Sequence, residues 1–254
     1  VWATEYMRDE GFRKYWDEYT PPYHKHGVGR LYKGRPARAY HQNMNMFARN
    51  AVKRWYEYFR ERPGTGDRVS SGGVNIIFSE TNTHYRGTQN YRLSGMVDAM
   101  RTPKDAFFAH QVMWNGWVDP EIHDTYIIGH WNYVNGVAKD VSIVSTGDRV
   151  ELLLNGKSLG FGRKEDGFLF TFDKVEWKPG KLTAISYNKE GKKLDETSIQ
   201  TAGQPKRIKL TMHTGPHGVK ADGTDLALVD VEVVDESGQR CPTALDMIEF
   251  ELKG

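Results

Sequence analysis

The sequence contains a single cysteine, Cys241, so a disulfide within the chain is excluded and the cellular compartment stays open. It also lacks an excess of charge of either sign: 35 Lys and Arg residues face 33 Asp and Glu residues, a net charge of +2. This balance points neither to nucleic acid nor to a membrane surface as a partner. No stretch approaches the roughly 18 apolar residues of a membrane span.

The first residues, Val1-Trp2-Ala3-Thr4, are neither an initiator methionine nor a signal peptide. We therefore expect the chain to begin inside a longer protein, or to have been processed. Its 254 residues suffice for about two ordinary domains. Aromatic residues make up 12% of the sequence. Sugar-binding sites use such rings, but so do ordinary cores, and we favour the core explanation.

The first half of the chain mixes helical and strand-like patterns. Residues 11–19 predict a short helix, and residues 37–60 predict a long amphipathic one. Residues 74–78 predict a buried strand, followed by a polar loop over residues 79–92. Another helix is expected over residues 103–117. This order is typical of an α/β domain. The apolar residues of the long helix that recur at three- and four-residue spacing are Met44, Phe47, Ala48, Ala51, Trp55, Tyr58 and Phe59.

After Pro120 the pattern becomes all-β, and the spacing of short strands predicts a sandwich. Asn155-Gly156 and Lys189-Glu190-Gly191 are typical hairpin turns. Gly203-Gln204-Pro205 resembles a linker. The predicted domains are residues 1–119, 120–203 and 204–254, the last of them short for a complete sandwich. The expected strands are residues 126–131, 141–145, 150–154, 168–172, 182–187, 194–201, 208–213, 226–235 and 247–252.

Three segments carry a recognisable pattern. They are Ala3-Thr4-Glu5-Tyr6 with the following MRDEG, then Ser94-Gly95-Met96-Val97-Asp98 with Pro103-Lys104, and VELLLNGKSLG at residues 150–160. Together they resemble glycoside hydrolase family 2: its nucleophile motif, its closing barrel segment and its C-terminal sandwich signature. Residues 221–226 and 231–235 look like the next sandwich domain of the same enzymes.

The resemblance implies a fold that is α/β followed by all-β. A C-terminal fragment of a (β/α)8 barrel, a TIM barrel, would precede immunoglobulin-like β-sandwich domains. It also implies a retaining exo-β-glycosidase that acts on a carbohydrate substrate without a cofactor. A β-galactosidase is the first expectation. A β-glucuronidase, or a glycosidase for acidic or sulfated sugars, is the alternative.

Barrel enzymes place catalytic groups at the C-terminal ends of strands. The resemblance makes Glu5 the nucleophile and sets Tyr6 beside it. Retaining glycosidases need a second carboxylate about 5–5.5 Å away. That acid/base Glu is expected on an earlier strand, outside this chain. The chain alone is therefore expected to be inactive and to need the N-terminal part of the same enzyme as its partner.

Glu80 is the rival carboxylate, because it also follows an apolar strand. Phe78 stands where family members tend to place a Trp as a wall of the sugar pocket. The loop that follows offers donors and acceptors for sugar hydroxyls, although a solvated loop explains them equally well. These predicted substrate-binding residues are Asn82, His84, Arg86, Asn90 and Arg92.

Arg86 and Arg92 bear on substrate choice, because arginine binds carboxylate or sulfate through two parallel hydrogen bonds. Glucuronidases of the family share an Asn-x-Lys motif before a Gly-Ile pair. Asn90-Tyr91-Arg92 is the nearest equivalent here, with two extra residues before Gly95. This departure counts against a glucuronidase and leaves the sugar open.

Other polar residues predict no further chemistry. His24, His26 and His41 lack the carboxylates and spacing of a metal site, and Lys104 is expected to cap structure. The rival function is a carbohydrate-binding or scaffolding sandwich without catalysis. The alternation of apolar residues favours a core, and so a structural role for the sandwich. These residues are Leu152, Leu154, Phe168, Phe170, Phe172 and Trp177.

Overall fold

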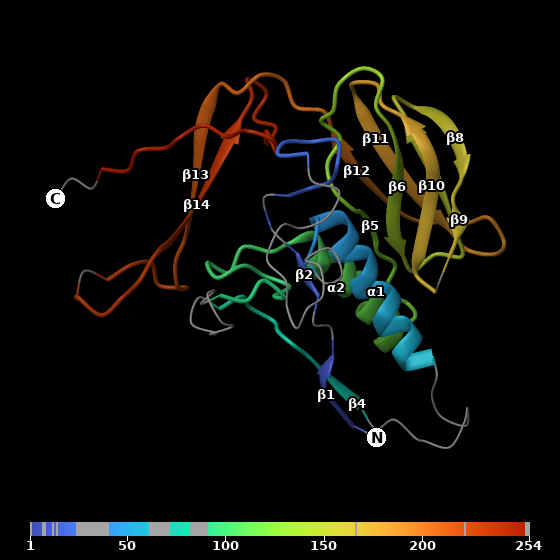
Figure 1. The fold of residues 1–254 in the computed structure, drawn as a ribbon, viewed down its shortest axis with the longest axis horizontal. Coiled ribbons are helices and arrows are strands. Elements are labelled where there is room, and N and C mark those ends of the chain that lie inside the picture. Colours follow the sequence, from blue (N-terminus) through green and yellow to red (C-terminus); the bar gives the residue numbers. More distant parts are fainter. Residues whose placement is uncertain are drawn as a thin grey trace. The chain divides into compact units, whose positions relative to one another are not determined.

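The computed structural model describes residues 2–6, 9–11, 13, 15–23, 41–60, 72–81, 91–165, 167–220 and 222–251, and for residues 2–6, 41 and 58–60 it describes the backbone alone. The chain forms two compact units, Val1–Ile199 and Gln200–Gly254. Strands dominate the described residues, with two helices in the first unit (Figure 1). No helix among these residues is both long and apolar enough to cross a bilayer.

The core of the first unit is a sandwich of two four-stranded sheets (Figure 1). One sheet has the order β5-β6-β10-β9, from Thr125–Ile127, Ala138–Ser145, Leu169–Glu176 and Arg163–Lys164. The other has the order β12-β11-β7-β8, from Lys193–Gln200, Lys181–Tyr187, Arg149–Leu154 and Lys157–Phe161. Strands β7 and β11 alternate between buried and more exposed residues, as strands with one buried face do.

A pair of helices covers the outer face of the first sheet. Helix α1 (Met44–Arg60) and helix α2 (Asp105–Val118) share a core with Val144 of β6 and Leu169 of β10. Ile143, one residue from Val144, faces the opposite core between the two sheets. Because both faces of β6 are covered, all residues from Val141 to Ser145 are buried.

Two short parallel pairs precede the sandwich. Strand β1 (Trp2–Tyr6) pairs with β4 (Gly72–Asn75), and Tyr6 lies opposite Asn75. Strand β2 (Glu10–Gly11) pairs with β3 (His41–Gln42). Helix α1 lies between β1 and β4 in the sequence, as the crossover between parallel strands requires. The barrel fragment to which these pairs would belong stays a prediction.

A buried ion pair attaches the segment after β2 to the sandwich. Lys139 of β6 pairs with Asp17. Tyr133 donates a hydrogen bond to the same carboxylate at 2.6 Å, and Lys139 donates to the Tyr133 hydroxyl at 2.5 Å. Asp17 also accepts hydrogen bonds from the backbone N–H of Tyr19 and the hydroxyl of Thr20. Its carboxylate is therefore fully hydrogen-bonded although it is buried.

Among its described residues, the second unit holds one antiparallel pair, β13 (Arg207–His213) and β14 (Leu228–Val234). Lys209 pairs with Glu232 at 3.3 Å, and His213 contacts Asp230 at 2.7 Å. Leu210 lies opposite Val231 on the other face. The strands predicted at residues 208–213 and 226–235 are thus present, whereas residues 247–251 are irregular and the strand predicted there is wrong.

The long helix and the closing helix of the first half are confirmed as α1 and α2. Helix α1 starts later than predicted, because His41 and Gln42 form β3 and Asn43 caps the helix by accepting the backbone N–H of Met46 at 2.9 Å. The helix predicted over residues 11–19 is wrong. Gly11 is in β2, and the Asp17 carboxylate accepts a hydrogen bond from the backbone N–H of Tyr19. Such a bond favours a turn over a helix.

The predicted sandwich strands are present, although the first of them ends at Ile127 and not at residue 131, and the structure adds the edge strands β8 and β9. Residues of these edge strands are mostly exposed, so they carry no apolar alternation in the sequence. The strand predicted at residues 74–78 ends at Asn75. Its predicted burial is wrong for Val74 and Phe78, which are 48% and 60% exposed.

Replacing Leu152 by alanine is expected to lower the free energy of unfolding by about 2–5 kcal/mol, since the cavity adds to the lost burial. The side chain is 0% exposed and lies in the core between the two sheets. Urea unfolding of the chain measures the loss. The exposed Leu159 of β8 provides the control, because its replacement by alanine removes no core contact. Equal losses for both variants would contradict the assignment of this core.

Candidate active site

The candidate site lies where the chain leaves β1 and β4. Because the two strands are parallel, residues 9–11 and 76–81 leave the pair at the same edge. Glu5 and Tyr6 are the last two residues of β1. Their side chains lie outside the described part of the chain. The structure therefore places the two residues at the end of β1 and describes only their backbone.

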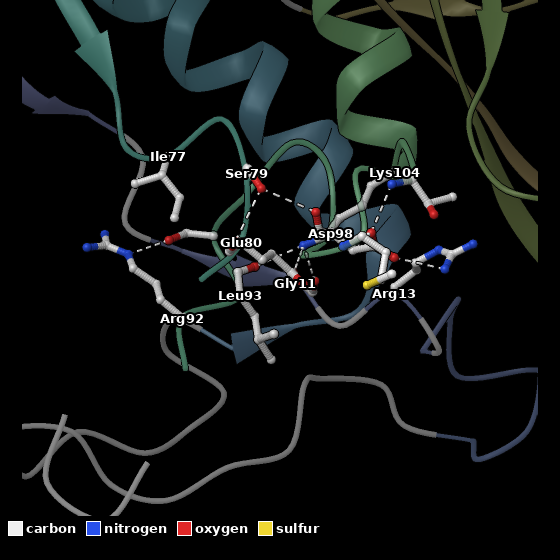
Figure 2. A network of polar contacts seen from close by, with 12 residues as sticks. Gly11, Arg13, Ile77, Ser79, Glu80, Arg92, Leu93, Asp98 and Lys104 are labelled. Atoms are coloured by element: carbon white, nitrogen blue, oxygen red, sulfur yellow. Dashed lines mark hydrogen bonds and ion pairs between the residues drawn. The ribbon is translucent and has the colours of Figure 1, made fainter. Parts of the chain in front are cut away.

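Lys104 joins three segments at this edge. It occupies the position before the first residue of α2, and its side chain is 1% exposed. Its ammonium donates to the carbonyl oxygens of Gly11 at 2.7 Å and Leu93 at 3.0 Å. The third contact is an ion pair with Glu80. Figure 2 shows Gly11, Leu93 and Glu80 gathered around this group.

Burial weakens the charged form of both partners of this ion pair. Loss of water raises the pKa of the Glu80 carboxyl above its ordinary value, and the nearby Lys104 charge counteracts that rise. Burial lowers the pKa of the Lys104 ammonium, and Glu80 opposes that change. The Glu80 side chain is only 8% exposed and is turned to an internal cation, so the ion pair links residue 80 to the start of α2.

Backbone hydrogen bonds connect the segments that flank the predicted loop. Glu80 N–H donates to Val97 carbonyl oxygen at 3.0 Å, and Arg92 N–H donates to Thr81 carbonyl oxygen at 2.9 Å. Gly95 allows the close approach. A Cβ atom there would lie 2.4 Å from the backbone nitrogen of Glu80, so a side chain does not fit.

Further hydrogen bonds around Asp98 hold the ends of these segments. Asp98 accepts a hydrogen bond from Arg13 at 2.9 Å and from the backbone N–H groups of Met100 and Thr102, each at 2.9 Å. The hydroxyl of Ser79 donates to the Asp98 carbonyl oxygen at 3.3 Å (Figure 2). The turn before α2 is thereby tied to the chain after β2 and after β4.

The segment after β1 is also anchored to α1. Asp9 pairs with Arg54 at 2.8 Å and accepts a hydrogen bond from Gln42 at 2.7 Å. Burial raises the pKa of Asp9, and the charge of Arg54 opposes this rise. Asn50 donates to Gln42 in turn at 3.0 Å. Residues 9–11 thus have fixed partners on two sides.

The predicted substrate-binding residues differ in their surroundings. Phe78 is exposed and contacts Phe107 edge to face, with ring centres 6.2 Å apart. Arg92 is only 3% exposed, and its Nε donates to the Ser94 hydroxyl at 2.5 Å. Glu80 is held by Lys104. Four of the predicted residues lie outside the described part of the chain: Asn82, His84, Arg86 and Asn90.

Sequence reasoning missed the connection made by Lys104 and the contact of Arg13 with Asp98. The signal for Lys104 in the sequence is its position after Pro103 at the start of a helix. That position predicted a cap and did not indicate the three groups that Lys104 contacts. Within the described residues, no group of three or more His, Cys, Asp and Glu side chains is placed to hold a metal ion. His24 and His26 lie outside those residues, and His41 is described by its backbone alone.

Two domain families match the second half of the chain. Residues 136–195 match a domain of unknown function, DUF4982, and residues 208–254 match glycoside hydrolase family 2 C-terminal domain 5. Among solved structures, a β-glucuronidase from glycoside hydrolase family 2 superposes with a TM-score of 0.80 at 34% identity, covering 96% of this chain and 24% of that chain.

Curated relatives extend the similarity over the whole sequence. A β-glucuronidase from Formosa agariphila is 37% identical over 253 residues, which is 99% of this chain and 24% of that protein. The β-galactosidase BoGH2A from Bacteroides ovatus is 36% identical over 161 residues, covering 63% of this chain and 18% of that protein. The chain thus spans a quarter or less of the length of these two relatives.

Proposed function

The chain belongs to glycoside hydrolase family 2, and from this premise we propose that it forms a C-terminal part of a retaining exo-β-glycosidase for terminal β-linked sugars. One observation carries the proposal: β1 ends at Glu5 and Tyr6 and runs parallel to β4. This is the placement that a barrel gives to its catalytic groups. In this proposal residues 1–119 complete a (β/α)8 barrel, and residues 120–203 and 204–254 form sandwich domains.

Glu5 is the proposed nucleophile. Its carboxylate attacks the anomeric carbon, and the leaving oxygen takes a proton from an acid/base Glu that this chain does not supply. Water then releases the sugar, activated by the same acid/base residue. Tyr6, the next residue of β1, is proposed to lie beside the site.

Glu80 is the weaker candidate for the nucleophile. Its carboxylate is buried against Lys104 and would have to give up an ion pair before it reached a sugar. We propose that Glu80 and the buried Arg92 shape the substrate loop between them. Phe78, which is exposed, then forms a wall of the sugar pocket, and Asn82, His84, Arg86 and Asn90 contact the hydroxyls.

The sandwich is proposed to serve as a scaffold. Leu152, Leu154, Phe170, Phe172 and Trp177 all lie in the core between the sheets, so they form no exposed aromatic platform for sugars. Phe168 packs against the other core, beneath the helices. This burial favours the structural role over the rival function of a carbohydrate-binding module.

A β-galactoside and a β-glucuronide are the two candidate substrates. The glucuronide is favoured by a relative at 37% identity and a solved structure at 34% identity, which cover 99% and 96% of this chain, since both are β-glucuronidases. The galactoside is favoured by a second relative of nearly equal identity over fewer residues.

We predict that the full-length protein carrying this chain hydrolyses a nitrophenyl β-galactoside or β-glucuronide with retention of anomeric configuration. Proton NMR of the first-formed sugar measures the configuration. Residues 1–254 alone are expected to release no nitrophenol from either compound, because the acid/base Glu is missing. Inversion by the full-length protein, or clear turnover by residues 1–254 alone, would contradict the proposal.

A further inference from the structure

We infer that Lys104 is a positioning residue of the proposed active site. Its side chain holds the chain that leaves β1 against the segments around β4. In this way it fixes the end of the strand that carries Glu5. The inference deepens the proposed function and rests on it. Lys104 itself contacts no reacting atom in this account. It acts on the reaction through the backbone.

The contacts of the ammonium are specific in number. A lysine has three N–H donors and no acceptor. Here groups from three separate segments surround it: the Gly11 and Leu93 carbonyl oxygens accept hydrogen bonds, and the Glu80 carboxylate forms an ion pair. The ring of Phe47 in α1 lies 5.2 Å from the nitrogen. Removal of this side chain therefore releases three segments at once.

The effect reaches Glu5 over a short stretch of chain. Only four residues separate Tyr6, the last residue of β1, from Gly11. Gly11 cannot shift toward α1 freely, because a Cβ atom there would already lie 2.6 Å from Phe47. The carbonyl of Gly11 is held by Lys104, and its backbone is paired to β3, so Gly11 is held from two sides. A small displacement at a catalytic carboxylate costs about 10²-fold in rate.

A purely structural role of the buried pair is the alternative. Loss of one partner of a buried ion pair destabilises a protein in any case. A loss of activity alone would not separate the two roles. The test therefore compares Lys104→Met with Leu152→Ala, a variant that is destabilised in the sandwich core away from this site.

The experiment uses the full-length protein. The probes are a 2-fluoro-β-galactoside and a 2-fluoro-β-glucuronide, each activated by a dinitrophenyl leaving group. Attack by the nucleophile forms the carboxylate–anomeric carbon bond and expels dinitrophenolate with its electron pair. Fluorine slows the later hydrolysis, so the glycosyl-enzyme accumulates and its mass is measured. The limiting labelling rate and the probe concentration at half-maximal rate are determined separately, at a temperature where every variant is folded.

We expect Lys104→Met to lower the limiting labelling rate by about 10²-fold. The half-saturating probe concentration should change by a smaller factor than the rate, because the substrate loop is affected only through Glu80, which loses its partner. Lys104→Arg keeps the cation and should restore part of the rate. Leu152→Ala should stay within about twofold of the unaltered protein, because distant sites act independently. The inference is overturned if Lys104→Met is labelled at the rate of the unaltered protein. It is also overturned if Leu152→Ala, with the same thermal unfolding midpoint as Lys104→Met, is labelled equally slowly.

Amide hydrogen exchange supplies a measurement that is independent of activity. In Lys104→Met, peptides from residues 2–11 and 91–97 should exchange faster, while β11 should not change. Unchanged exchange in those peptides also overturns the inference. If the unaltered protein takes no label from either probe, the proposed function fails and the inference fails with it. The exchange pattern still shows whether Lys104 holds the segments, so the two failures are distinguishable.

Discussion

Glu5→Gly in the full-length protein is expected to lower kcat by about 10⁴-fold, or about 5 kcal/mol of transition-state stabilisation. The glycosyl-enzyme cannot form without the carboxylate, and the nearby acid/base residue cannot replace it. Azide or formate should restore turnover in this variant, because a small anion fits the space left by the side chain and attacks the anomeric carbon. Initial rates with a nitrophenyl glycoside measure both effects.

Two carboxylates serve as comparisons for Glu5. Glu121 is exposed after α2, and Glu121→Gly is expected to leave kcat unchanged. Glu80→Gln removes the ion pair with Lys104 and is expected to reduce stability and rate moderately, without rescue by azide. If Glu80→Gly instead lost turnover that azide restored, and Glu5→Gly stayed active, Glu80 would be the nucleophile.

The second large effect concerns stability and the buried pair of Asp17 and Lys139. Lys139→Met is expected to lower the free energy of unfolding by about 3–5 kcal/mol, because it leaves the Asp17 carboxylate buried without its counter-charge. Urea unfolding of the chain at neutral pH measures this change. The double variant with Asp17→Asn should recover part of the loss, because the amide carries no charge and still accepts hydrogen bonds.

Lys178→Met is the matched control for Lys139→Met. Lys178 is exposed, and its contact with Glu176 is 3.8 Å long, so its loss should change the free energy by less than about 1 kcal/mol. Equal losses for the two lysine variants would contradict the importance of the buried pair. The comparison separates burial of the charge from the mere removal of a lysine.

The same pair predicts a pH dependence. Burial alone would raise the pKa of Asp17, but the charge of Lys139 and the hydrogen bonds from Lys139 and Tyr133 outweigh it, so the pKa is lowered from 3.8. A carboxyl whose pKa is lower in the folded than in the unfolded chain stabilises the fold at a pH above its unfolded-state pKa. This stabilisation is lost as the pH falls through its folded-state pKa. Lys139→Met should therefore lose less stability than the unaltered chain on acidification below pH 3.8.

Local patterns predicted the elements whose burial follows the period of the backbone. Phe47, Ala51 and Trp55 repeat at helical spacing and lie on the buried face of α1. Asn155 and Gly156 have φ angles of 52° and 80° and form the tight turn between β7 and β8. Such features depend on neighbours in the sequence, so the sequence contains them.

The site depends on contacts between distant residues, and the sequence could not predict these. The side chain of Asp17 competes for the backbone of Tyr19 and pairs with Lys139, which removed the helix expected over residues 11–19. Glu80 and Lys104 are 24 positions apart, and no local period connects them. The pattern therefore indicated Glu80 as an acid at a strand end, and it gave no sign of the partner at the start of α2.

Locating the covalent sugar tests the central claim most directly. The full-length protein is labelled with the activated 2-fluoro-glycoside, digested and sequenced by tandem mass spectrometry. The account predicts one added fluoro-sugar on Glu5, in the peptide that contains residues 2–6. A label on Glu80, on another carboxylate, or on no residue after complete exposure to both probes would contradict it.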